Sequence, residues 1–527
     1  MLGYLRRLAT TGFAYTASSV LSKLVAVALL PLYTRYLSPA DYGAAEVMIA
    51  ALTASSILIR FGVIEALLRF YYLESERPER VVATGFALLL WTTTLGAALA
   101  MAFAEPISEA LLDRSDAGLA RIAIGGLWVA TLYEYLVALF RLDERARAYF
   151  FFTFANVALA VPLTVWLVVF EDLGAQGLLI GTYAAATPFL IWLLFDARHR
   201  LAVLPDVPLL RRMMRFGLPT MPAEFSLYAL NFIDRIMLVR LAGLAEAGLY
   251  ALAFRFSQSI QILVRGFKLA WPPLAYSIRE DSEARRVYAV IVTWYAAIAA
   301  FAVIGMWLLA RWLVRALAAP EFFSAFEAIG PLCLGAALYG LYLVLLVVLG
   351  RTGRTEFNFP ATFAGTATNI GLNLALIPTY GVAGAGFALV GSYVVVLVLM
   401  YAFTQRLFPV RWEWRRLALV AGPAVLFVAC GELLLPTSGA VGLLSRAALW
   451  LSYPVLLWVL RLPTPAERRA LTLALHPRAL IASLRQRAED ASAAAEADGD
   501  QAPSLRRGGF APEVYEVEER DEDRGGA

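Results

Sequence analysis

Cysteine, histidine and lysine are scarce in this 527-residue chain, which contains two of each. Cys333 and Cys430 lie inside apolar segments, so we expect no disulfide framework, and neither is suited to act as a thiol nucleophile. His199 and His476 lie outside the apolar segments, which excludes a histidine relay within a membrane. The sequence shows no metal-ligand cluster, nucleophile-base set or nucleotide-binding glycine loop, so we expect no cofactor, no metal and no enzymatic reaction.

Charged residues are also few. They make up 16% of the chain, whereas hydrophobic residues make up 60% and the mean hydropathy is +0.68. These values lie outside the range of soluble proteins and predict an all-α polytopic membrane protein. The formal charge of +4 comes mostly from arginines between apolar segments, and it indicates no nucleic-acid partner.

About fourteen apolar segments are long enough to span a bilayer, which takes about 20 residues as a helix. They lie near residues 9–33, 42–63, 81–104, 119–140, 150–170, 174–195, 213–238, 247–270, 287–313, 327–349, 357–377, 383–408, 417–435 and 440–461. The first run is too long for a signal-peptide core and no small-residue cleavage site follows it, so we expect it to remain in the protein.

The distribution of arginine predicts the orientation, because positively charged short loops stay in the cytoplasm. Most loop arginines fall in alternate loops, around residues 77–80, 141–147, 198–215, 279–286, 351–354 and 406–416. We therefore expect a multi-pass protein of the inner (cytoplasmic) membrane with both termini in the cytoplasm.

The chain repeats itself with a period of about 205 residues. A shift of 205 places Arg35 on Arg240, Asp41 on Glu246, Gly43 on Gly248 and Arg60 on Arg265, and a shift of 207 places Gly174 on Gly381. These matches predict two parallel six-helix repeats plus an extra C-terminal helix pair. Such repeats build transporters whose substrate path lies between the halves.

Four parts follow from the repeat and the hydropathy. We expect an N-terminal six-helix lobe at 1–200, a C-terminal six-helix lobe at 201–410, the extra transmembrane helix pair at 411–461, and a tail at 462–527. The tail is rich in small and polar residues and acidic at its end, which is the composition of a disordered cytoplasmic segment.

Polar residues line one face of the first two helices of each half. An ionisable group inside a bilayer costs several kcal/mol unless it faces protein, a partner or water, so these faces predict a central cavity between the halves. The candidates for binding substrate there are Lys23, Arg255, Arg60, Arg265, Glu224, Asn231, Gln258 and Arg235. The candidates for coupling to protons or sodium are Glu46, Glu224, Asp234 and Glu134.

The alternative is that these residues pair with one another inside the helix bundle. It applies most to Arg60 and Arg265, which are expected near the cytoplasmic interface, where long side chains reach water. Lys23 is one of only two lysines, and both lie in membrane segments. A compact ammonium with a shiftable pKa is one explanation for this placement, and codon drift is the other.

Three stretches of the sequence resemble the polysaccharide flippase branch of the multidrug/oligosaccharidyl-lipid/polysaccharide exporter (MOP) superfamily. They are LPLYTRYLSPADYG at 30–43, NFIDRIMLVRLAGLAEAGLYALA at 231–253 and NIGLNLALIPTYGVAGAGFA at 369–388. The resemblance implies a two-lobed bundle that moves an undecaprenyl-pyrophosphate-linked oligosaccharide from the cytoplasmic to the outer leaflet. We interpret the first stretch as helix punctuation rather than a binding site, because Asp41 follows the Ser38-Pro39 turn and suits the positive end of a helix.

The implied partners are the lipid-linked oligosaccharide, membrane lipid, and the polymerase and assembly proteins of surface polysaccharide biosynthesis. Three alternatives stay open. The extra helix pair is more typical of lipid II-type peptidoglycan precursor flippases. A cation-coupled exporter of drugs or small molecules has the same fold. A membrane enzyme of glycan assembly is disfavoured, because every loop expected on the outer side is short.

Overall fold

The computed structural model describes residues 28–73, 77–143, 145–465 and 467–468. The described residues up to 460 belong to one compact unit, and those from 461 on belong to a second one. Lys23, most of the first predicted membrane segment and nearly all of the predicted tail lie outside the described residues.

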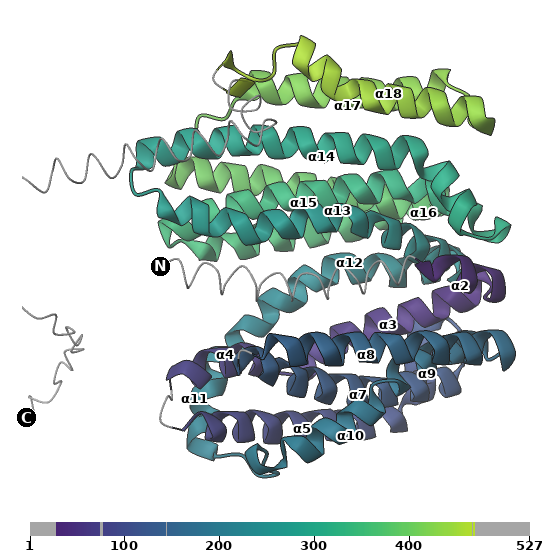
Figure 1. Cartoon of the computed structure of the whole chain (residues 1–527), viewed down its shortest axis with the longest axis vertical. Helices are drawn as coiled ribbons and strands as arrows, with labels where there is room; N and C mark the ends of the chain where they lie inside the picture. Colours follow the sequence, from purple (N-terminus) through teal and green to yellow (C-terminus); the bar gives the residue numbers. More distant parts are fainter. Residues whose placement is uncertain (1–27, 74–76, 144, 466, 469–527) are drawn as a thin grey trace, which may run out of the picture. The chain divides into compact units, whose positions relative to one another are not determined.

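Every secondary-structure element in the described part of the chain is helical, as the composition predicts. The N-terminal half, up to residue 200, contains α2 (Leu30–Tyr36), α3 (Pro39–Ile59), α4 (Val63–Leu73), α5 (Pro78–Ala102), α6 (Ala104–Leu112), α7 (Ala117–Leu142), α8 (Ala146–Val165), α9 (Gly174–Ala184) and α10 (Thr187–Asp196). The C-terminal half, residues 201–410, contains α11 (Val207–Gly217), α12 (Met221–Ala242), α13 (Leu244–Ser277), α14 (Asp281–Leu317), α15 (Phe326–Thr352) and α16 (Asn358–Leu407). The last two helices, α17 (Trp414–Leu434) and α18 (Gly439–Val459), pack against α14 (Figure 1).

Ten helices among the described residues are long and apolar enough to cross a membrane. Together they cover eleven of the fourteen predicted segments, because α16, at 50 residues, contains two of them. Gly381 divides α16 with a non-helical backbone conformation (φ 50°, ψ −130°). The seventh and eighth segments form α12 and α13, which carry several charged residues, and the first lies mostly outside the described residues. The count of fourteen stays a prediction.

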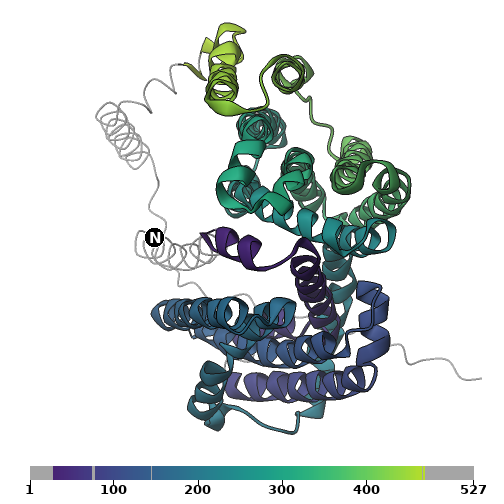
Figure 2. The same ribbon diagram turned by 90° about the vertical axis from the view of Figure 1, so that its right-hand side faces the viewer.

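Two hydrophobic cores hold the helices together. The larger core joins buried side chains of α2, α3, α7 and α9 to those of the C-terminal half. The smaller core contains residues of the N-terminal half together with Leu209 and Met213 of α11. Apolar packing therefore joins the two halves on the side where α3 and α13 begin. Figure 2 shows many of these helices end on.

The backbone preserves the sequence repeat. Gly174 and Gly381 both have positive φ, of 52° and 50°. Gly174 is the first residue of α9, and Gly381 lies directly before the second part of α16. Beyond Gly381 the helix starts with Val382, whose N–H donates to Glu246 Oε2 at 3.0 Å. In the other half, Asp41 is the side chain nearest to Gly174. Asp41 and Glu246, which align at the 205-residue shift, thus occupy equivalent places beside a helix N-terminus.

The punctuation predicted for the first stretch is confirmed at α3. The Ser38 hydroxyl accepts from the Asp41 N–H at 3.1 Å, Pro39 occupies the first helical turn, and Asp41 lies in the same turn. An N-cap of this kind satisfies backbone donors that the helix leaves free.

Gly43 and Gly248, which also align in the repeat, contact each other across the two halves. A Cβ atom on Gly43 would lie 2.1 Å from the carbonyl oxygen of Leu244, and one on Gly248 would lie 2.0 Å from that of Pro39. No other residue fits at either position without separating α3 from α13. The contact is therefore a pseudo-twofold point at which the halves touch through backbone atoms.

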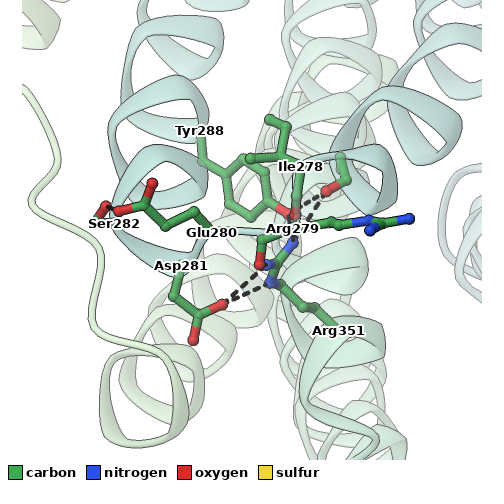
Figure 3. Close-up of polar contacts among 8 residues, drawn as sticks. Ile278, Arg279, Glu280, Asp281, Ser282, Tyr288 and Arg351 are labelled. Atoms are coloured by element: carbon green, nitrogen blue, oxygen red, sulfur yellow. Dashed lines mark hydrogen bonds and ion pairs between the residues drawn. The ribbon is translucent and has the colours of Figure 1, made fainter. Parts of the chain in front are cut away.

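A single arginine fastens one end of the C-terminal half (Figure 3). Arg351, in the last turn of α15, donates to the carbonyl oxygens of Ala275 at 3.2 Å, Ile278 at 2.8 Å and Arg279 at 3.2 Å. Its Nη2 also donates to Asp281 Oδ1 at 2.9 Å. The end of α13, the start of α14 and the end of α15 are thus held by one planar group whose five donors suit such a fork.

Adding one methyl group at the contact between the halves should be costly. Gly43→Ala and Gly248→Ala are each expected to lower the free energy of unfolding by about 1–3 kcal/mol, because the backbones must separate. Reversible unfolding in mixed micelles measures the change. Gly371→Ala is the matched control, because a Cβ there meets nothing within 4 Å. Equal stability of all three variants would contradict the close contact.

Arg351→Gln is expected to destabilise the protein by about 1–3 kcal/mol, because two part-buried carbonyl groups, those of Ala275 and Ile278, lose a charged donor. The control is Arg354→Gln, three residues along, whose ion pair with Glu356 joins side chains that are 54% and 58% exposed. Exposed pairs contribute about 0–1 kcal/mol. Chemical unfolding of both variants measures the difference, and a loss at Arg354 as large as at Arg351 would refute the assignment.

Candidate functional site: a charged cavity between the halves

A cavity of about 760 Å³ lies among helices of both halves. Its lining comes from α2, α3, α8 and α9 of the N-terminal half and from α12, α13 and α14 of the C-terminal half. Most of the lining is apolar. The polar side chains are Tyr33, Glu46, Thr53, Thr164, Thr182, Tyr228, Arg235, Arg255, Gln258 and Ser259.

Glu46 is the centre of the charge in this cavity. Its side chain is buried, with only 5% of the residue exposed, although α3 is one of the candidate membrane spans. Arg255 Nη2 donates to Glu46 Oε1, and Arg235 Nη1 lies 3.5 Å from Glu46 Oε2. Arg235 Nη1 also donates to the backbone carbonyl of Glu46 at 3.1 Å. One carboxylate of the N-terminal half is thus shared by two guanidinium groups of the C-terminal half.

The cluster carries an excess of one positive charge when all three groups are ionised. Arg235 Nε is buried and has no hydrogen-bond partner among the described residues. Each arginine also contacts an aromatic ring. Arg255 Cζ lies 5.5 Å from the centre of the Tyr42 ring, and Arg235 Cζ lies 5.2 Å from the centre of the Phe254 ring. The cavity wall is therefore able to accept a further anion.

These charges do not follow the repeat. At a shift of 205, Glu46 aligns with Ala251, Arg235 with Leu30 and Arg255 with Ala50. The glycines and the acidic residues Asp41 and Glu246 are duplicated, and the charged cluster is not. Residues that occur in both halves serve the fold that the halves share. A charge that occurs in one half alone indicates a role inside the cavity.

A second polar cluster is buried inside the C-terminal half. Asp234 accepts from Tyr250 Oη at 2.7 Å and from Asn373 Nδ2 at 2.7 Å. Asn373 Nδ2 also donates to Asn369 Oδ1 at 3.1 Å, while Asn369 Nδ2 and Asn373 Oδ1 are buried without a partner among the described residues. A buried carboxylate beside an amide oxygen that has no partner among the described residues, Asn373 Oδ1, can take up a proton or a small cation.

The structure places the predicted site residues in three groups. Glu46, Arg235, Arg255 and Gln258 line the cavity, and Asp234 lies in the second cluster. Arg60 and Glu134 form an ion pair with each other, a partner that the sequence did not indicate for Arg60. Arg265 is exposed on α13. Neither Arg60, Glu134 nor Arg265 lines the cavity as the described residues form it.

The remaining candidates are not placed. Lys23 lies outside the described residues, and the side chains of Glu224 and Asn231 are also outside the described part, although their backbone belongs to α12. Sequence reasoning gave no role to Tyr250, Asn369 or Asn373. The signal that could have found the amides is their i, i+4 spacing in an otherwise apolar segment.

The family model described as polysaccharide biosynthesis protein matches residues 32–327, more than half of the chain. The chain belongs to this family. The match confirms the resemblance to polysaccharide flippases of the MOP superfamily. No curated protein matches the chain.

Solved structures of the superfamily share the fold. The chain is similar to the lipid II flippase MurJ in an inward closed conformation, with 11% identity and a TM-score of 0.67, over 86% of this chain and 99% of that chain. It is also similar to an inward-facing multidrug resistance MATE family transporter, with 14% identity and a TM-score of 0.61, over 73% of this chain and 94% of that chain. The family member described here is therefore a multi-pass membrane protein with the transporter fold.

Replacing Glu46 by Gln should leave two guanidinium groups without their counter-charge. We expect the free energy of unfolding to fall by about 3–5 kcal/mol, as when one partner of a buried pair is removed. The control is Glu134→Gln, since Glu134 also pairs with an arginine but its side chain is 54% exposed. Its loss should stay below about 1 kcal/mol. Unfolding in mixed micelles tests both, and equal losses would disprove the special position of Glu46.

Proposed function

We propose that this family member flips an undecaprenyl-pyrophosphate-linked oligosaccharide across the inner membrane for the biosynthesis of a surface polysaccharide, such as lipopolysaccharide or exopolysaccharide. The membership of the polysaccharide biosynthesis family and the transporter fold support the general class. The proposal includes the direction, from the cytoplasmic to the outer leaflet, and cytoplasmic positions for both termini.

The excess positive charge beside Glu46 is the observation that carries the proposal. A diphosphate brings about two negative charges, and burying them without cationic partners is prohibitive. Arg255 and Arg235, with its unpaired Nε, supply charge-assisted donors inside the cavity. Neutral polar groups on the same wall, such as Gln258 and Ser259, suit sugar hydroxyl groups, while the prenyl chain stays in the bilayer.

The proposal includes alternating access, and the contacts that connect the halves support it. The halves touch through Gly43 and Gly248 near the starts of α3 and α13, and rocking about this point would open or close the cavity. An anion that binds Arg255 competes with Glu46 for it, so cargo loosens a contact between the halves. In this proposal Asp234 couples the motion to a proton or sodium ion, and Glu46 takes a proton when its arginines bind cargo.

Two other cargoes belong to the same fold. A lipid II-type precursor also carries a diphosphate, so the charged cluster does not distinguish it from an oligosaccharide intermediate. A small-molecule exporter for organic cations fits less well, because the cavity carries net positive charge. Polymerase and assembly proteins are the proposed partners after translocation.

The test is the translocation of a fluorescent undecaprenyl-pyrophosphate oligosaccharide in proteoliposomes. We expect Arg255→Gln to reduce the rate at least tenfold, which corresponds to the loss of one charge-assisted hydrogen bond. Arg354→Gln, an exposed arginine outside the cavity, should leave the rate unchanged, and both variants are checked for folding. Lys23→Ala joins the series because Lys23 is the remaining cationic candidate in a membrane segment.

Further arms separate the alternatives. Movement of lipid II in preference to the oligosaccharide substrate would favour the peptidoglycan precursor, and export of an organic cation without movement of either lipid would favour the drug exporter. Imposed sodium and proton gradients identify the coupling ion, and Asp234→Asn should abolish the response to that gradient. Equal rates in the parent and Arg255→Gln would refute the cationic cavity.

A further inference from the structure

A separate apolar recess of about 290 Å³ lies in the C-terminal half, beside the extra helix pair. It shares no lining residue with the central cavity. Its walls come from α14, α15, the second part of α16 and the start of α17, and the lining residues are Val292, Leu341, Leu345, Leu397, Val398, Tyr401, Trp412, Trp414 and Leu417. The helices that provide the walls are candidate membrane spans, so the recess faces an environment of lipid.

Aromatic side chains mark one end of this recess. Trp412 precedes α17 and is only 8% exposed, whereas Trp414, the first residue of α17, is 60% exposed. The Tyr401 and Trp414 rings meet edge to face with their centres 5.5 Å apart. Trp and Tyr are enriched where hydrocarbon meets lipid headgroups. The recess thus extends from apolar walls within the spans to the level of the headgroups.

Two arginines that form no ion pair within the described part of the chain lie next to these tryptophans. Arg411 precedes Trp412 and Arg415 follows Trp414; both are exposed, and neither forms an ion pair with a described residue. Glu413 is the only acidic residue among residues 411–417, and its carboxylate already accepts hydrogen bonds from other side chains. Arg416 donates to it at 2.7 and 2.8 Å, and the Thr293 hydroxyl donates to it at 2.7 Å.

An apolar recess with free cations at the headgroup level has the chemistry of an anionic lipid site. We propose that the recess holds an acyl chain of an anionic phospholipid and that Arg411 and Arg415 bind its phosphate. The site joins the extra helix pair to the rest of the C-terminal half, because its wall includes residues of α14 and α17. The bound lipid therefore fills a space between α17 and the bundle. This proposal does not depend on the cargo of the central cavity.

Native mass spectrometry of the purified full chain tests the proposal with two lipids of identical acyl chains, phosphatidylglycerol and phosphatidylcholine. We expect the parent to bind phosphatidylglycerol about tenfold more tightly, since each arginine near an anionic headgroup contributes severalfold. Arg411→Gln combined with Arg415→Gln should remove this preference. Val398→Trp, which fills the recess at a residue that is 59% exposed, should reduce the binding of both lipids.

The matched control is Arg211→Gln combined with Arg215→Gln, which removes two exposed arginines from α11. It should keep the preference for phosphatidylglycerol. Equal binding of the two lipids by the parent, or an equal loss in the control, would overturn the proposal. Inorganic phosphate should not displace the lipid, and displacement by it would show an anion site without a chain. Displacement by an equimolar polyprenyl diphosphate would show that the recess belongs to the transported lipid instead.

Discussion

The ionic contact of Glu46 with Arg235 and Arg255 constrains the whole arrangement, because none of these charges is stable alone at membrane depth. Glu46 comes from the N-terminal half and both arginines come from the C-terminal half. Either half by itself would expose an uncompensated charge to hydrocarbon. The halves are therefore bound to each other by desolvated charges as well as by apolar packing. Any motion that separates them has to provide replacements, an anion for the arginines and a proton or cation for the carboxylate.

The close backbone contact between α3 and α13 determines where Glu46 and the two arginines meet. Gly43 and Gly248 let α3 and α13 approach until each would-be Cβ overlaps a carbonyl oxygen of the other half. Small residues at helix interfaces are the common means of close packing in membranes, where hydrophobic attraction between helices is absent. The hydrogen bonds of Arg351 act within one half, since they join the end of α15 to the end of α13 and the start of α14. The halves themselves are joined by the glycine contact, the larger apolar core and the ionic contact of Glu46.

Sequence reasoning predicted the fold well because its signals are strong. Apolar segments of bilayer length, aligned glycines and aligned acidic residues survive in the sequence without any knowledge of contacts. A polar group within an apolar segment is costly unless it faces protein, a partner or water. This cost is why the sequence drew attention to Glu46, Arg235, Arg255 and Gln258.

Contacts between distant residues were harder to predict. Arg60 and Glu134 are 74 positions apart, and nothing in the sequence shows that they form a pair. Asn369 and Asn373 were given no role, because a neutral amide does not stand out as a charge does. Their importance appears only when the fold brings Asp234 to within 2.7 Å of Asn373. The pairing of Glu46 with two arginines was likewise beyond the sequence, since it depends on the rotation of three helices.

The contact between Gly43 and Gly248 also bears on the origin of the chain. A single six-helix ancestor with one such glycine would have met its own copy at that point, as a parallel homodimer with an isologous interface. In that dimer every charge would have occurred twice, so a lone carboxylate shared by two arginines could not have existed. Fusion of two copies removed this restriction, because Ala251, Leu30 and Ala50 now occupy the positions equivalent to Glu46, Arg235 and Arg255. Gene duplication thus preserved the close contact between the halves and allowed the charges in the cavity to become asymmetric.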